Sequence, residues 1–318
     1  MKLLKKILTI SILVVLLSAN AYAQSANQTA NGFRVSPVRN DITIEKGKSD
    51  SVVVSVENPA NIPLKATALI NDFIASEKED GEPRLLLDGG FANSHSFKRI
   101  ATTVDNLEFA PKEHKDIKVI ITIPANAKAG GYYGAIRFVT DTGSKSNLAL
   151  TASVGSLFLV NVPGNIKENL SIIDFTAGAK GEGKKLITTG NVSMITRIKN
   201  TGDVHEQPFG KIIIKSSNGK TVSETEFNNT EPKSNILPDS TRKFENLINN
   251  KKWLGHYTAS ISLGYGNNTN ELANATSSFW YIPIWLIFVA VVVLVVILAA
   301  IYVIYRKVRT RKNAKRRT

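Results

Sequence analysis

The chain has 318 residues, a formal net charge of +14 and no cysteine, which excludes disulfides, thiolate metal ligands and a cysteine nucleophile. Eleven of its 40 Lys and Arg residues lie at the two ends, three before residue 7 and eight after Tyr305. The body between them holds 29 basic and 26 acidic residues, so its charge is only +3. This distribution argues against a nucleic-acid-binding protein, and no nucleic-acid partner is predicted.

The N-terminal stretch MKLLKKILTISILVVLLSANAYA, residues 1–23, predicts a secretory signal peptide. It has a basic start, a short apolar run and an A-x-A cleavage pattern, which places cleavage between Ala23 and Gln24. An uncleaved membrane anchor is the alternative, although the apolar run is short for a span. Residues 24–32 are expected to form a flexible N-terminus.

The region 33–266 is expected to be all-β. In SDSVVVSVEN, Val52, Val54 and Val56 alternate with polar residues, and KDIKVIITIP alternates in the same way at 117–123. This period of two is typical of strands that bury one face. No amphipathic helical pattern of ten or more residues occurs in the region, so antiparallel sandwiches are predicted.

A weak internal repeat divides this region into two copies. The strands GGYYGAIRF and GHYTASISL share the pattern G-x-Y-x-(small), and each lies at a similar distance after a proline that precedes a strand. We therefore predict two tandem immunoglobulin-like β-sandwiches, at 33–164 and 165–266. Tyr132 and Tyr257 are predicted to be structural tyrosine corners, whose hydroxyl groups bond to backbone upstream.

The stretch RIKNTGDVHEQPFGKIIIK places three side chains that can bind metals or move protons, Asp203, His205 and Glu206, within four positions. The first copy builds the equivalent turn at 61–64 without any of them. A solvated turn is therefore predicted rather than a metal or catalytic site. No other catalytic motif is recognised in the sequence, so no catalytic residue, metal or cofactor is predicted.

The segment from residue 76 to residue 99 is long and irregular. Its acidic part, SEKEDGEP at 76–83, could supply carboxylates to a glycosidase, but a solvated loop is the favoured interpretation. Its aromatic and basic side chains could stack on and hydrogen-bond a glycan or a protein surface, and a mobile loop without a ligand is the alternative. The candidate ligand-binding residues are Phe91, His95, Phe97, Lys98 and Arg99.

The C-terminal region is expected to anchor the protein. The polar residues 267–279 predict a flexible stalk, and 280–305 contain no charged residue, which predicts one transmembrane helix that contacts the lipid bilayer. The basic residues 306–318 predict a cytoplasmic tail by the positive-inside rule. The expected location is the cell membrane, with a single span and the N-terminal domains outside.

Several stretches of the first copy resemble the WxL-interacting proteins of Gram-positive bacteria. They are FRVSPVRNDITIEKGKSDSVVVSVEN, EDGEPRLLLDGG, and LEFAPKEHKDIKVIIT followed by IPANAKAGGYYGAIRF, which together cover about 33–162. The resemblance implies a bacterial surface protein whose first domain associates with peptidoglycan and whose second domain engages a partner.

The function expected from the sequence is that of a membrane-anchored, non-catalytic binding or scaffold protein. Its expected partner is a cell-wall glycan or a surface protein. An extracytoplasmic assembly factor or the outer half of a sensor is the alternative, and a β-sandwich hydrolase ranks below both.

Overall fold

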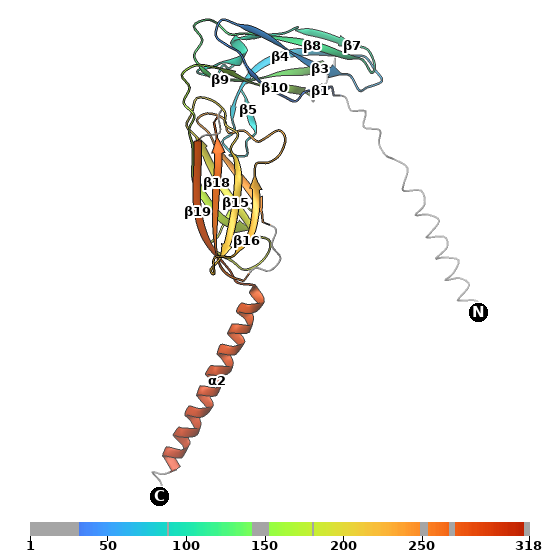
Figure 1. Ribbon diagram of the computed structural model, residues 1–318. Helices are drawn as coiled ribbons and strands as arrows, with labels where there is room; N and C mark the ends of the chain where they lie inside the picture. Colours follow the sequence, from blue (N-terminus) through green and yellow to red (C-terminus); the bar gives the residue numbers. More distant parts are fainter. Residues whose placement is uncertain are drawn as a thin grey trace, which may run out of the picture.

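The computed structural model describes residues 32–87, 89–141, 153–179, 181–248, 254–266 and 271–314. The predicted signal peptide, its cleavage site at Ala23 and Gln24, and residues 24–31 lie outside the described residues. The described chain forms two β-sandwiches that meet at a bend, and one long helix follows the second sandwich (Figure 1). The prediction of a mostly β chain with two sandwich domains and one C-terminal apolar helix is confirmed at this level.

The first sandwich consists of two sheets, with strand orders β1-β3-β8-β6 and β2-β10-β9-β4-β5, and β7 also pairs with β4. The chain moves from one sheet to the other between β1 and β2, because β1 pairs with β3 whereas β2 runs parallel to β10. The strands are β1 Arg34–Ser36, β2 Arg39–Thr43, β3 Ser49–Glu57, β4 Leu64–Ala75, β5 Pro83–Leu85, β6 Ala101–Thr102, β7 Asn106–Phe109, β8 His114–Thr122, β9 Gly130–Asp141 and β10 Ser153–Val162.

The core of the first sandwich follows from the alternation seen in the sequence. Val54 and Val56 on β3 are fully buried, and the alternating isoleucines and valine of β8, the neighbouring strand of the same sheet, lie beside them in the same core. Glycine at position 134 is required by packing, because a Cβ there would lie 2.1 Å from the ring of Phe97. The period of two therefore identified the buried face of these strands.

The second sandwich also has two sheets, with orders β12-β11-β14-β17 and β13-β19-β18-β15-β16. The turn Asn218-Gly219 joins β15 to β16, and Gly219 has the left-handed φ of +80° that such a turn favours. The strands are β11 Leu170–Ala179, β12 Glu182–Gly183, β13 Leu186–Ile187, β14 Ser193–Asn200, β15 Phe209–Ser216, β16 Thr221–Phe227, β17 Thr241–Leu247, β18 Gly255–Tyr265 and β19 Glu271–Tyr281.

The prediction of a polar stalk at 267–279 is wrong for every residue of it that the structure describes. These residues belong to β19, which pairs with β18 along its whole length, from Tyr265 opposite Glu271 to Gly255 opposite Tyr281. Ala273 and Ala275 pack against the core, and Phe279 is 1% exposed within it. Small alanines on the inner face hid the alternation, so the second sandwich extends to Tyr281 rather than ending at 266.

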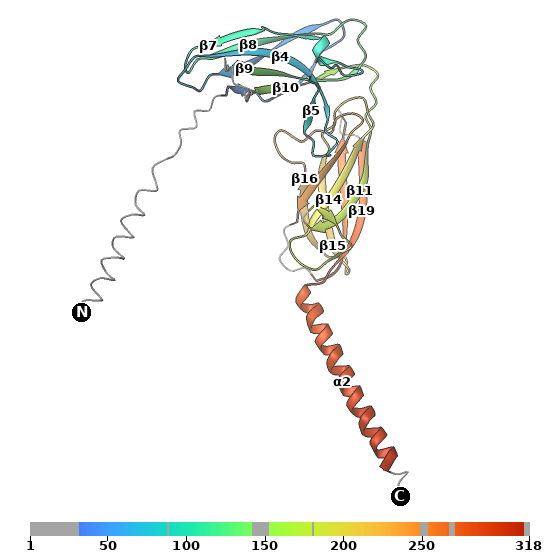
Figure 2. The ribbon, with the colours of Figure 1, turned by 180° about the vertical axis from the view of Figure 1, so that it is seen from behind.

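The final helix, α2, spans Ile284–Ala314. It begins four residues after the predicted start, because Trp280 and Tyr281 still belong to β19. The 23 residues Ile284–Arg306 are long and apolar enough to cross a membrane. The backbone remains helical through the first residues of the predicted basic tail, up to Ala314. Figure 2 shows the helix leaving the end of the second sandwich that is opposite the bend.

The two repeated tyrosines occupy similar positions in their sandwiches. The hydroxyl of Tyr132 donates to the carbonyl oxygen of Lys128 at 3.1 Å. The hydroxyl of Tyr257 donates to the Leu254 carbonyl oxygen and accepts the Leu254 N–H, both at 2.9 Å. Each tyrosine is thus bonded to backbone three or four residues upstream, near the start of β9 or β18.

Candidate functional site

The two sandwiches are joined by the turn that the sequence singled out. The hydroxyl of Tyr133, on β9 of the first sandwich, accepts the backbone N–H of His205 at 2.7 Å. The N–H of Gly131 donates to the carbonyl oxygen of Asp203 at 3.0 Å. The side chain of His205 is 13% exposed, and Glu206 is 5% exposed. The prediction of a solvated turn is therefore wrong for His205 and Glu206, which are largely buried, whereas Asp203 is exposed.

A second contact is made by the acidic segment between β4 and β5. The carboxylate of Glu79 accepts two hydrogen bonds from the guanidinium of Arg197 on β14, at 2.7 and 2.5 Å. The carbonyl oxygen of Glu79 also accepts the N–H of Lys243, on the edge strand β17. The hydrogen bond from Arg197 lowers the pKa of the Glu79 carboxyl below its usual value. This segment, predicted to be a solvated loop, instead docks the first sandwich on the second.

Arg39, on the edge strand β2, makes the third contact. Its guanidinium donates to the carbonyl oxygen of Lys233 at 2.9 Å and to the side-chain oxygen of Asn235 at 3.0 Å. It also forms an ion pair with Asp41 of the same strand at 2.5 Å. Contacts from β2, β9 and the β4–β5 segment thus hold the two sandwiches in one orientation.

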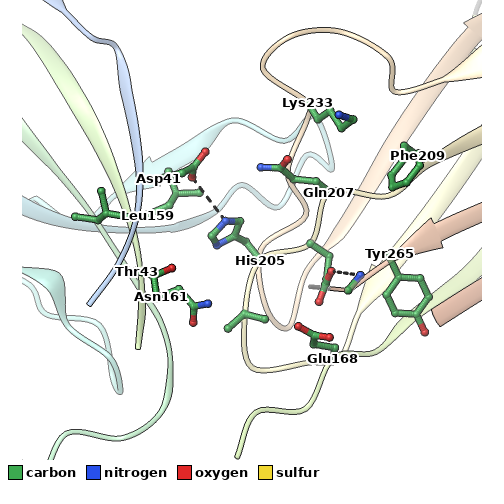
Figure 3. Close-up of a pocket in the computed structure, with 14 residues that line it drawn as sticks. Asp41, Thr43, Leu159, Asn161, Glu168, His205, Gln207, Phe209, Lys233 and Tyr265 are labelled. Atoms are coloured by element: carbon green, nitrogen blue, oxygen red, sulfur yellow. Dashed lines mark hydrogen bonds and ion pairs between the residues drawn. The ribbon is translucent and has the colours of Figure 1, made fainter. Parts of the chain in front are cut away.

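A cavity of about 370 Å³ lies between the domains, beside these contacts (Figure 3). The first sandwich contributes side chains from β2 and β10, and the second contributes the turn after β14, the start of β15 and the end of β18. The segment that links the domains contributes Glu168. The polar and aromatic lining residues used below are Asp41, Asn161, Glu168, Glu206, Phe209 and Tyr265.

Glu206 is the most buried acidic side chain in this lining. Its Oε2 accepts the N–H of Gly266 at 3.0 Å, whereas its Oε1 is buried and has no hydrogen-bond partner. Its backbone is fixed by reciprocal hydrogen bonds with Ile236. Burial, together with a smaller contribution from the neighbouring Glu168 carboxylate, raises the pKa of the Glu206 carboxyl to about 7, although the hydrogen bond from Gly266 acts in the opposite direction.

His205 is held in the neutral state by its surroundings. Burial lowers the pKa of its imidazole to about 4, although the nearby carboxylate of Asp41 favours the charged form. The Tyr133 hydroxyl lies 3.3 Å from Nδ1, so we assign the hydroxyl proton to that contact and the ring proton to Nε2. Nε2 lies 3.6 Å from Asp41 Oδ1. His205 therefore acts here as a structural link between the domains.

The cavity does not have the composition of a metal site. Over the described part of the chain, no group of three or more His, Asp or Glu side chains is placed to hold a metal ion. Asn161, which also lines the cavity, has a buried Oδ1 without a hydrogen-bond partner. Asn161 and Glu206 thus each have one buried side-chain oxygen without a hydrogen-bond partner among the described residues.

The five residues predicted to bind a ligand lie in one loop but do not form one surface. Phe97 is fully buried and stacks on Phe158, with 5.1 Å between ring centroids, so its ring belongs to the core. His95 packs edge-on against Tyr132, and its Nε2 lies 3.0 Å from the carbonyl oxygen of Ala129. The prediction of a ligand contact is therefore wrong for Phe97, whereas His95 is half-buried and lines a second pocket, so for it the prediction stays a prediction.

The remaining three residues of that loop are partly exposed. The ring of Phe91 is 45% exposed, and the cationic groups of Lys98 and Arg99 lie 4.8 and 4.9 Å from its centroid. The loop is held by the buried carboxylate of Asp72, which accepts the hydroxyl of Ser96 and the N–H groups at positions 92 and 98. An acid inside the apolar strand LKATALINDFIA was the signal for this anchor.

No family model and no curated protein sequence matches the chain. Solved structures do match it. The class 5 fimbriae chaperone CfaA is 16% identical over 78% of this chain and 99% of its own, with a TM-score of 0.39. The CsuC–CsuE chaperone–tip adhesion subunit complex of Acinetobacter baumannii is 9% identical over 79% of this chain and 99% of its own, with a TM-score of 0.34. The E. coli chaperone DraB is 10% identical over 78% of this chain and 96% of its own, with a TM-score of 0.32. At these values no activity is carried over to this chain.

These comparisons correct the resemblance to WxL-interacting proteins over 33–162. The structures named above are described as a fimbriae chaperone, a pilus chaperone complex and a chaperone, not as WxL-interacting proteins, and no family model places the chain among the WxL-interacting proteins. The peptidoglycan ligand that the resemblance implied is withdrawn with it.

Proposed function

We propose that this chain is a non-catalytic extracytoplasmic binding protein that holds an extended segment of a partner protein in the cleft between its sandwiches. Of the interpretations open from the sequence, this is closest to an assembly factor. The observation that carries it is the cavity of about 370 Å³, which is walled by both domains. Its volume lies within the range of roughly 300–1,000 Å³ that is common for binding pockets.

The fixed orientation of the domains supports a binding role. Tyr133, Arg39 and Glu79 all bond directly across the domain boundary. A cleft whose walls are already in place loses less conformational entropy when it receives a ligand. The cleft is therefore preorganised.

The edge strand β2 supports a polypeptide as the partner. β2 is the outermost strand of its sheet, and its residues Asp41 and Thr43 line the cavity. An edge strand offers unpaired backbone groups to which an extended segment can add as a further strand. A partner segment that lies along β2 would pass directly over the cavity.

The membrane orientation is part of the same proposal. With Ile284–Arg306 across a bilayer, the basic residues after it favour the cytoplasmic side, and both sandwiches then lie outside. The chain would present its cleft to other exported proteins.

Site-specific photo-crosslinking in the cells that make this protein tests the proposal. A photoreactive amino acid replaces Phe209, which lines the cavity and is 39% exposed, and in a matched chain it replaces Val53, which is exposed on β3. We expect one discrete adduct, identified by mass spectrometry, from position 209 and none from position 53.

Equal adducts from both positions, or none from position 209, would contradict the proposal. The mass of the captured partner provides the second readout. A partner recovered at its intact mass supports a non-catalytic role, whereas a partner cleaved at one site only in the presence of this chain would show an enzyme.

A further inference from the structure

The pairing of β13 with β19 continues past both strands into the first residue of the helix. The N–H of Ile282 donates to the carbonyl oxygen of Ile187 at 2.9 Å, and the N–H of Ile284 donates to that of Thr188 at 3.0 Å. Only Ile282 and Pro283 lie between β19 and α2. The start of the helix and the end of the second sandwich beside it, here called the base, therefore form one unit, so the position of one determines that of the other.

Apolar side chains are exposed at the base. Leu186 on β13 is directly opposite Trp280 on β19, and Trp280 is opposite His256 on β18, so these three side chains lie in a row on one face of the sheet. Leu186 and Trp280 are each about half exposed, and the ring centroids of His256 and Trp280 are 5.1 Å apart. Leu254, which directly precedes β18 at the same end, is 58% exposed. Adjoining exposed apolar groups of this kind indicate an interaction surface.

These side chains lie close to the apolar part of α2. Trp280 precedes Ile284 by four residues, which span at most about 13 Å of extended chain. Leu254 is closer still, because the residue after it, Gly255, is opposite Tyr281. The headgroup layer on each side of a hydrocarbon core is roughly 5–8 Å thick. With the apolar part of α2 in such a core, Leu254 would lie within this layer, and a modest tilt of the sandwich would bring Trp280 into it.

The direction of the helix supplies that tilt. In both views of the molecule, α2 slopes away beneath the side of the second sandwich that carries β19 (Figures 1 and 2). If α2 crosses a bilayer close to upright, the sandwich tips so that this side comes down. The sheet order β13-β19-β18-β15-β16 makes β13 the outermost strand on that side. Leu186 and Trp280 would then lie on the edge of the sheet nearest to the bilayer.

We propose that the base of the second sandwich is a lipid-contacting surface, with Leu186, Leu254 and Trp280 among the headgroups of the outer leaflet. The assignment rests on the membrane span proposed above, and it goes beyond that span because it seats the second sandwich on the bilayer. Tryptophan is enriched at membrane interfaces, since its ring is apolar and its N–H is a hydrogen-bond donor.

Continuity with α2 favours lipid over a second protein chain as the occupant. Ile284 and Trp285, the first two residues of the helix, are also exposed and extend the apolar surface from the base onto the span. Lys185 is exposed directly before Leu186, so this edge of the sheet carries a positive charge, whereas Lys184 is already paired with an acid of β12. A basic side chain beside apolar ones suits a bilayer that contains anionic headgroups.

The absence of cysteine from the sequence allows one spin label to be attached at a time. Single cysteines replace Leu186, Leu254, Leu272 or Val292 in the full chain, which is reconstituted in nanodiscs of phosphatidylcholine and phosphatidylglycerol. Leu272 is the matched control, because it is 67% exposed on the same strand as Trp280 but at the cleft end. Val292 on α2 reports the span itself. Oxygen, which concentrates in lipid, and a water-soluble nickel complex are the two relaxing agents.

We expect the labels at 186, 254 and 292 to be more accessible to oxygen than to nickel, and the label at 272 to show the reverse. Nickel accessibility should be several-fold lower at 186 and 254 than at 272. All four positions have exposed side chains, so each labelled chain is expected to fold, and its thermal unfolding midpoint checks this.

A second measurement uses the native indole. Trp253→Phe together with Trp285→Phe leaves Trp280 as the only tryptophan. Lipids brominated near the headgroup end of the acyl chain should quench its fluorescence several-fold more than that of a control chain whose only tryptophan is introduced by Leu272→Trp. Equal quenching in the two chains would contradict the lipid-contacting surface.

The outcomes separate this inference from the proposals on which it rests. Labels at 186 and 254 as accessible to nickel as the label at 272, with 292 in lipid, overturn the lipid-contacting surface and leave the span in place. A label at 292 in water overturns both. Low nickel accessibility at 186 that persists in lipid-free amphipol, with spectral broadening by a second label, shows a second copy of the chain at the base and also overturns the surface. Adducts from position 209 test the cleft independently of all these results.

Discussion

The hydroxyl of Tyr133 on the first sandwich accepts the backbone N–H of His205 on the second at 2.7 Å. The bond joins a side chain on β9 to a turn that begins after β14, and both groups are buried. The hydroxyl group of Tyr133 thus fixes the backbone of the neighbouring domain, and we expect its removal to lower the stability of the protein.

Tyr133→Phe is expected to lower the free energy of unfolding by about 1–3 kcal/mol, because the buried N–H of His205 loses its acceptor. Chemical denaturation of the full chain measures this change. Tyr281→Phe, whose hydroxyl bonds to the carbonyl oxygen of Gly190 at an exposed site, is the control and should change the value by less. A broadened distribution of spin-label distances between the domains should accompany the Tyr133 change. An unchanged midpoint and an unchanged distribution would show that the bond does not hold the domains.

Tyr257→Phe should destabilise the second sandwich by about 1–3 kcal/mol, and Tyr132→Phe should destabilise the first by a smaller amount. The difference is expected because the Tyr257 hydroxyl both donates to and accepts from Leu254, whereas that of Tyr132 is shown with one backbone bond. Thermal unfolding of each variant checks the order. Equal midpoints in wild type and both variants would disprove the structural role of the tyrosine corners.

The ion pair between Glu79 and Arg197 is expected to contribute only about 0.5–1 kcal/mol, because both side chains are partly exposed. A double-mutant cycle with Glu79→Ala and Arg197→Ala measures this coupling. The coupling should shrink when the salt concentration is raised, whereas the hydrogen bond from the Lys243 N–H to the Glu79 carbonyl remains. A coupling that is independent of salt would indicate a desolvated pair.

Phe279→Ala tests the assignment of residues 271–281 to a strand. Phe279 is 1% exposed, so the change should cost about 3–5 kcal/mol of stability. Trp280→Ala, at the next position and 51% exposed, is the matched control and should cost far less. Equal small effects of both changes would restore the stalk interpretation.

Glu206 and His205 are expected to oppose one another in the pH dependence of stability. Glu206 has its pKa raised from 4.5 to about 7, so between these values only the folded state holds its proton, and stability falls as the pH rises. His205 has its pKa lowered from 6.5 to about 4, so between these values only the unfolded state holds its proton, and stability falls as the pH falls. From pH 4.5 to 6.5 the two slopes cancel.

Single variants should expose each slope. Glu206→Gln leaves the contribution of His205, so its stability relative to wild type should rise with pH across the shared window by about 1.4 kcal/mol per pH unit. His205→Gln leaves the contribution of Glu206 and should show the opposite sign. Asp41 and Arg39 face His205, and Glu168 faces Glu206, and all three remain in both variants. Denaturation at several pH values measures the slopes, and equal signs would contradict the assignment.

Much of the fold could be predicted from local pattern, because strands such as β3 bury one face of branched side chains. β19 could not, because its inner face is built from Ala273 and Ala275, and alanine does not stand out against serine and asparagine. The helix α2 was found because an uncharged stretch of this length has few other structures open to it.

The candidate site was harder to predict. Asp203, His205 and Glu206 were noticed as polar residues, but the sequence did not show that His205 and Glu206 become buried while Asp203 stays exposed. The alignment of residues 203–206 with the turn at 61–64 predicted the backbone conformation of the turn, but it did not predict that the side chains would be buried. Glu79 was likewise judged from its acidic neighbours, whereas its role depends on Arg197, 118 positions away.

β19 runs from the cleft to α2 with only Ile282 and Pro283 between them, so with α2 across a bilayer, as proposed, the second sandwich would fix the height of the cleft above it. At roughly 3.3 Å per residue, the 11 residues of β19 place the cleft about 35 Å from the start of the helix. On the function proposed above, a partner segment that starts at the same bilayer would have to extend about ten residues before it could enter the cleft. The length of β19 would thus determine which part of the partner the cleft can hold.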